Sequence, residues 1–154
     1  MPKSWVFITT SKVNSPEVSM EINQFLSEWK THGKLISSFN LQIYFDQVIL
    51  ITDLNDESSG CSIDNLQRSI QEIVNQSGGE ITEFGSISYL DNESENEKIT
   101  SIPRSKIKEY LLQGKINKKT VIVNQEILNS ADPKSELFID AEKSWLSKAY
   151  SFTN

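Results

Sequence analysis

Two short runs of consecutive apolar residues, at positions 5–8 and 48–51, constrain the fold of this chain more than any other feature. A strand with one solvent-exposed face has a polar residue at every second position, whereas these runs are apolar at every position. They therefore predict two central strands that are covered on both faces of a sheet. The segments 35–44 and 81–90 do alternate, which predicts edge strands with one face toward solvent.

Two segments with apolar residues at helical spacing separate these strands. The first begins at Ser15-Pro16, where serine can cap a helix and proline suits its first turn, and Gly33 ends it. The second is capped by Ser62 and stops at Gly78-Gly79. The order strand, helix, strand, strand, helix, strand predicts an α+β fold with a ferredoxin-like βαββαβ core. Its antiparallel sheet has the order 4-1-3-2, which places the first and third strands inside.

The two helices can cover only one face of this sheet, so the other face needs a second cover. The C-terminal third, residues 98–154, predicts a helix after Pro103, a short strand at 120–123 and a last helix around Trp145. We expect this α-β-α extension to pack on the core formed by residues 1–90, within a single domain. A homodimer that joins two sheets face to face is the alternative cover.

The composition argues against several classes of protein. No run approaches the roughly eighteen apolar residues of a membrane helix, and the N-terminus lacks the apolar region of a signal peptide. We therefore expect a cytoplasmic protein that does not insert into membranes. One cysteine and one histidine exclude internal disulfides and Cys/His zinc sites, and we expect neither a metal nor a cofactor. The net charge of −6 argues against nucleic acid as a partner.

The charge is distributed unevenly along the chain. Residues 98–119 carry seven basic side chains and one acid, Glu109, a net charge of +6; since the whole chain carries −6, the remainder carries −12. One interpretation is a solvated face that balances the acidic loop 91–97, and the other is a docking patch for an acidic partner. The candidate partner surface consists of Arg104, Lys106, Lys108, Lys115, Lys118 and Lys119.

The common enzyme motifs are missing from the sequence. Neither Gly-Lys pair, at 33–34 or 114–115, has the earlier glycine of a phosphate-binding P-loop, and no Gly-x-Ser-x-Gly elbow occurs. The segment 76–80, QSGGE, is similar to the signature of ABC ATPases, but it follows a periodic apolar stretch and predicts a helix stop. Nucleotide binding is therefore the least favoured function.

One constellation of residues has chemical content. In the predicted topology the first helix ends, and the second begins, at the same end of the molecule, which brings His32 and Cys61 to that end. A cysteine at a helix N-terminus can be a nucleophile, a histidine its base, and an aspartate can orient the ring. Asp64 is one candidate orienter, with Asp53 and Asp56 as alternatives. The simpler interpretation makes these residues structural: the cysteine packs before the cap, and the charged groups complement helix dipoles.

The segments that contain this histidine and cysteine resemble a known family. The sequences W-K-T-H-G at 29–33, with the later Ser38-Phe39, G-C-S-I-D at 60–64 and S-W-L at 144–146 resemble uncharacterised short bacterial proteins labelled "ABC transporter ATPase". The resemblance covers nearly the whole chain. It implies no established activity, cofactor or catalytic residue, and the Walker A sequence of such ATPases is missing here.

The leading hypothesis is a cytoplasmic, non-enzymatic binding or assembly domain, because sheet faces and edges of this architecture pair readily with partners. Its partner is an unidentified protein or a second copy of the chain. The alternative is a small cysteine-dependent enzyme, in which Cys61 is the nucleophile, His32 the base and Asp64 the orienter.

Overall fold

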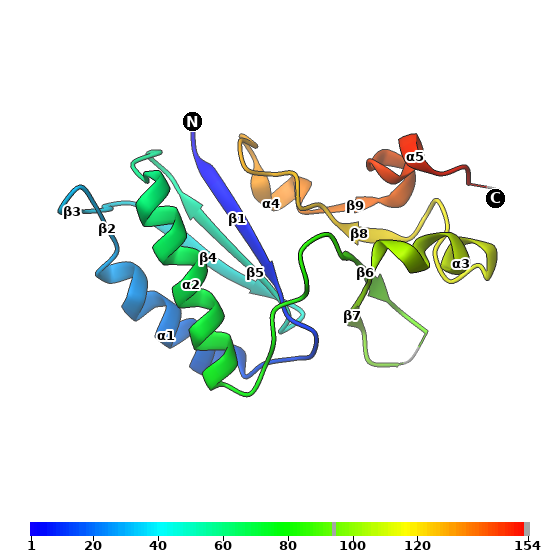
Figure 1. Cartoon of the computed structure of the whole chain (residues 1–154), viewed down its shortest axis with the longest axis horizontal. Helices are drawn as coiled ribbons and strands as arrows, with labels where there is room; N and C mark the ends of the chain where they lie inside the picture. Colours follow the sequence, from blue (N-terminus) through cyan, green and yellow to red (C-terminus); the bar gives the residue numbers. More distant parts are fainter. Residues whose placement is uncertain (94, 153–154) are drawn as a thin grey trace.

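The computed structural model describes residues 1–93 and 95–152, which form two main antiparallel sheets that lie side by side (Figure 1) and a small two-stranded sheet. The first sheet has the order β1-β5-β4, and the second has the order β7-β6-β8-β9. The strands of the first sheet are β1 (Lys3–Ile8), β4 (Phe39–Tyr44) and β5 (Val48–Asp53). Those of the second are β6 (Ile87–Asp91), β7 (Lys98–Ile102), β8 (Val121–Val123) and β9 (Phe138–Asp140). The predicted α+β class is therefore confirmed.

The two long helices, α1 (Ser15–Ser27) and α2 (Gly60–Gln76), pack on one face of the first sheet (Figure 1). The cap of α1 is Asn14, whose side chain accepts a hydrogen bond from the Glu17 amide. This helix ends at Ser27, well before Gly33, because the next residues form a small hairpin of β2 (Lys30–Thr31) and β3 (Lys34–Leu35).

The alternation of side chains gives the first sheet two apolar faces. Every residue of β5 is buried. Ile49 and Ile51 point toward α1 and α2 and join the core cluster between helices and sheet. Val48 and Leu50 point the other way, into a cluster that also contains Ile8. That cluster is completed from the C-terminal third of the chain by Ile99, Val123, Ile127 and Leu137. The chain itself thus covers both faces of β5.

The predicted strand order 4-1-3-2 differs from the observed one. β1, β5 and β4 have the order expected for the first, third and second strands, but the segment 81–90 does not form a fourth strand beside β1. Among the described residues only Ile81 bridges to Thr9, and the chain leaves the sheet after Thr82. The physical reason is burial: β6 lies between two strands of the second sheet, where its side chains find apolar partners that an edge position would not provide.

The C-terminal third contains more strand than its sequence indicates. The predicted helix, strand and helix correspond to α3 (Ile107–Leu112), β8 and α5 (Leu146–Ala149), but β7 and β9 were not expected. Short helical turns, η1 (Arg104–Lys106), α4 (Pro133–Glu136) and η2 (Ala141–Lys143), connect these elements. The core of this sheet is formed by Ile87, Tyr89, Ile102, Ile107, Ile116, Ile122, Ala141 and Leu146. No helix in the described part of the chain is long and apolar enough to cross a bilayer.

The buried side chain of Gln47 joins the two sheets. Its Nε2 donates hydrogen bonds to the carbonyl oxygens of Thr9 and Ile99, at 3.0 and 2.9 Å, and its Oε1 accepts one from the Ile99 amide at 2.9 Å. The side-chain amide therefore pairs with both backbone groups of Ile99, as a neighbouring strand would. In the same turn Phe45 packs edge-on against Phe138 of β9, with ring centroids 5.6 Å apart.

Replacing Gln47 with leucine should lower the free energy of unfolding by about 2–4 kcal/mol, because three buried backbone groups lose their hydrogen-bond partner. Urea denaturation followed by tryptophan fluorescence measures this change. Gln24→Leu, on the exposed side of α1, is the matched control and should shift stability by less than about 0.5 kcal/mol. Equal effects of the two substitutions would show that the buried amide does not hold the sheets together.

Candidate functional site

The end of the molecule singled out by the sequence lies where β5 passes into α2. This helix begins at Gly60 after the cap Ser59, three residues before the predicted cap Ser62. Ser62 Oγ accepts a hydrogen bond from the Ser59 amide at 2.7 Å and so helps to close the first turn. Cys61 therefore lies inside the first turn of the helix, and the residue is exposed.

The small hairpin after α1 carries His32 to the same end. Thr31 Oγ1 donates a hydrogen bond to Ser59 Oγ at 3.0 Å, which fixes the hairpin against the first turn of α2. His32, Cys61 and Asp64 are all exposed. No hydrogen bond joins these three side chains within the described residues, so the structure brings them to one end without connecting them as nucleophile, base and orienter.

The two alternative orienters are engaged with other groups. Asp53 is fully buried, and its Oδ2 accepts a hydrogen bond from the Ser58 amide at 2.8 Å. Its Oδ1 and the Ser58 Oγ are buried and have no hydrogen-bond partner among the described residues. Asp56 forms an ion pair with Lys3 at 3.0 Å. Across residues 1–93 and 95–152, no group of three or more His, Cys, Asp or Glu side chains is arranged to hold a metal ion.

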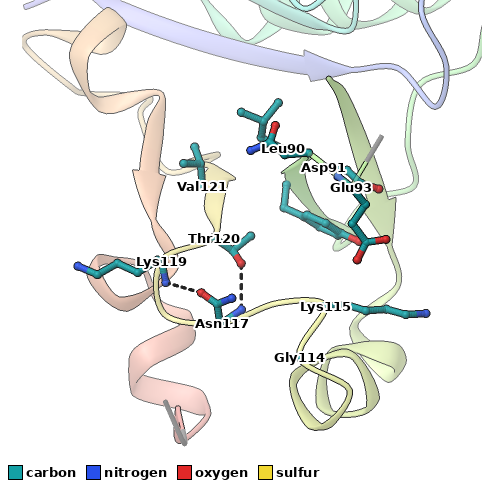
Figure 2. Close-up of a pocket in the computed structure, with 11 residues that line it drawn as sticks. Leu90, Asp91, Glu93, Gly114, Lys115, Asn117, Lys119, Thr120 and Val121 are labelled. Atoms are coloured by element: carbon teal, nitrogen blue, oxygen red, sulfur yellow. Dashed lines mark hydrogen bonds between the residues drawn. The ribbon is translucent and has the colours of Figure 1, made fainter. Parts of the chain in front are cut away.

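A pocket of about 400 Å³ opens beside the ends of β6 and β8 (Figure 2). These strands pair at Tyr89 and Ile122. Acidic residues of the loop after β6 and basic residues that precede β8 both contribute to its lining. The lining includes Tyr89, Asp91, Asn92, Glu93, Lys115, Asn117, Lys119 and Thr120. The acidic loop and the basic segment therefore meet at this pocket.

Several polar groups of this pocket take part in local turns. Asp91 Oδ1 accepts a hydrogen bond from the Glu93 amide at 3.0 Å. Across the pocket, Asn117 Oδ1 accepts one from the Lys119 amide at 2.8 Å, and Thr120 Oγ1 accepts one from the Asn117 amide at 2.9 Å (Figure 2). These side chains primarily shape the loops, which reduces their capacity to bind a ligand.

Tyr89 is the buried titratable group of the pocket. Burial, with a smaller contribution from the negative charges of Asp91 and Glu93, raises the pKa of Tyr89 to about 12. Its phenol therefore stays protonated at neutral pH, where it can donate a hydrogen bond but cannot act as a base. The pocket offers opposite charges and hydrogen bonds, without an activated base.

Two of the six candidate basic residues point in different directions. Figure 2 shows the side chains of Lys115 and Lys119 extending away from each other. Lys119 pairs with Glu142 at 3.1 Å, and this contact raises the pKa of Lys119. Arg104 lies over the ring of Trp145, 4.8 Å from its centroid. These contacts reduce the charge that the segment can offer to a partner.

An apolar groove of about 390 Å³ opens beside α3, inside the basic segment. It is lined by Lys108, Leu111, Leu112, Ala149, Tyr150 and Ser151. Leu112 is 79% exposed, and Lys108 forms no ion pair with any described residue. Lys115, which lines the charged pocket and not this groove, lies over the ring of Tyr110, at 4.8 Å from its centroid. The groove had no signal in the sequence, because one wall comes from α3 and the other from the distant C-terminal helix.

No family model, curated protein or solved structure matches this chain. Its function must therefore be inferred from the geometry of these sites. The resemblance to the short bacterial family stays a prediction from its motifs.

Cys61 should react with a thiol reagent in the native protein, because the residue is exposed. We expect His32→Ala to leave the labelling rate unchanged from about pH 6 to pH 9, since no hydrogen bond joins these two described side chains. Stopped-flow labelling measures the rate, with the denatured chain as the reference. A rate that falls about tenfold in His32→Ala would instead identify an activated nucleophile and its base.

Proposed function

We propose that this protein is a non-enzymatic, cytoplasmic binding domain that captures an acidic segment of a partner protein at the α3 groove. The observation that carries the proposal is the apolar groove inside the basic segment, with Leu112 exposed at its edge. We also interpret residues 1–82 as a ferredoxin-like unit whose fourth strand has moved into the second sheet.

The groove combines the two properties that recognise such a segment. Its leucine and tyrosine side chains favour the burial of an apolar residue from a partner. Lys108 in the lining attracts a carboxylate that flanks that residue. An acidic segment with one large apolar side chain would satisfy both.

The charge distribution also favours binding of an acidic segment at this groove. Residues 98–119 carry a net +6, whereas the rest of the chain carries −12. An acidic partner is therefore repelled by most of the protein and attracted to this segment, which gives specificity as well as affinity. Nucleic acid fits less well, because its binding requires many basic contacts with phosphates and the whole chain carries a net charge of −6.

A cysteine-dependent reaction is the second candidate. It is favoured by the exposure of Cys61 in the first turn of α2 and by the hydrogen bond from Thr31 to Ser59, which docks the turn containing His32 beside that helix. The labelling experiment described above decides this candidate. Nucleotide binding ranks last, since the chain has no phosphate-binding loop.

An array of acidic peptides, each with a single leucine or phenylalanine, tests the proposed function. We expect some of these peptides to bind, and Leu112→Asp and Lys108→Glu each to weaken binding by about tenfold or more, because one removes an apolar contact and the other reverses a charge. Fluorescence anisotropy at low and high salt measures the affinity, which should fall as salt rises.

Met20→Asp is the matched control, because Met20 is another exposed apolar side chain, 67% exposed on α1. This substitution should leave peptide binding unchanged. The proposal is wrong if no peptide of the array binds, or if the three variants weaken binding equally.

A further inference from the structure

Phe84 is fully exposed, at 108% of its reference area, the highest exposure among the large apolar side chains of the described residues. It lies in the segment where the chain leaves the first sheet and enters the second. Gly85 follows with φ of +88°, a left-handed conformation that turns the backbone toward β6. A phenylalanine ring presented to water in this way loses the free energy that its burial would provide.

A hollow of about 210 Å³ opens directly beside this ring. Its apolar lining consists of Ile87, Ile122, Val123 and Trp145. Arg104 also lines it, where the guanidinium is held by a hydrogen bond to the Gly85 carbonyl at 3.2 Å and by its stacking over the Trp145 ring. Ser86, Gln125 and Glu126 add polar groups, so the hollow is partly apolar. Phe84 itself belongs to the lining, so a protruding ring and this hollow are neighbours on one surface.

A protruding side chain next to a hollow makes a surface self-complementary. In a dimer with two-fold symmetry the same patch meets itself, so the ring of each copy faces the hollow of the other. An aromatic side chain buries roughly 150–250 Å² and is a common energetic centre of interfaces. The lining also holds both signs of charge, Arg104 and Glu126, so that two copies of the patch can face each other with opposite charges paired.

We propose that this chain forms a two-fold symmetric homodimer in which Phe84 of each copy inserts into the hollow of the other, against the half-buried ring of Trp145. A second copy fits better than an unrelated partner, because this chain supplies both the ring and the hollow, and an unrelated partner would use only one of them. The inference is independent of the proposed binding function, since the α3 groove shares no lining residue with this hollow.

Sedimentation equilibrium of the full chain, from about 1 to 300 μM, tests the proposal. We expect a monomer–dimer equilibrium within this range. Phe84→Ala should raise the dimer dissociation constant by about a hundredfold, because each dimer loses two buried rings. Leu112→Ala, which removes an exposed leucine from the other groove, is the matched control and should leave the constant unchanged.

A mixing experiment separates the ring from the hollow. Ser86→Phe fills the hollow, which Ser86 lines, and keeps Phe84 available for insertion. Each variant alone should be monomeric, whereas an equal mixture of Phe84→Ala and Ser86→Phe should form a heterodimer through the one intact pair of ring and hollow. This heterodimer should be weaker than the native dimer but stronger than the self-association of either variant, and circular dichroism melting shows whether each variant is folded.

Three results would overturn the dimer: a native chain that stays monomeric throughout, a dimer that persists in Phe84→Ala, or a mixture of folded variants without heterodimer. None of them changes the expectation for peptide binding at the α3 groove. Conversely, the loss of peptide binding leaves the sedimentation result intact, so the two proposals fail separately.

Discussion

The burial of β5 on both faces is the constraint on which the rest of the structure depends. All of its residues are buried, so a layer of side chains must lie on each side. The helices α1 and α2 form one layer, and residues of the C-terminal third form the other. Without that second layer, Val48 and Leu50 would be exposed to water, which costs about 25 cal/mol of folding free energy per Å² of apolar surface. Gln47 then adds directional hydrogen bonds that fix how the two sheets meet.

The path of the chain from β1 of the first sheet to β6 of the second produces the surface features that we connect with function. The chain pairs briefly with β1 through Ile81, then crosses to the second sheet. Phe84 in this crossing segment is exposed, and it borders the partly apolar hollow beside β6. At the far end of β6, the charged pocket opens beside β8. The pairing of β6 with β7 and β8 therefore leaves the hollow beside Phe84 and the charged pocket along the same strand.

The two ends of the molecule offer different chemistry. The end with the N-terminus of α2 has an exposed thiol, a histidine in a tight turn and a buried aspartate with an unpaired oxygen. The end with α3 combines positive charge with an exposed leucine.

Sequence patterns indicated both regions. The predicted topology places the cysteine and the histidine at one end, because it sets the direction of each helix. It does not specify whether the two side chains come within hydrogen-bond distance. The basic segment was visible as a run of charge, whereas its apolar groove needed a wall from α5.

The sequence by itself determined the elements whose signal is local: the two long helices, strand β4 and the buried strand β5. Each follows from the period of apolar residues along a short segment. Only the tertiary structure decided where residues 87–91 pair, that β7 and β9 are strands, and that Phe84 is left in water. The reason is that a strand pairs where it gains most burial, and the surface that buries β6 is built by residues that follow it in the chain.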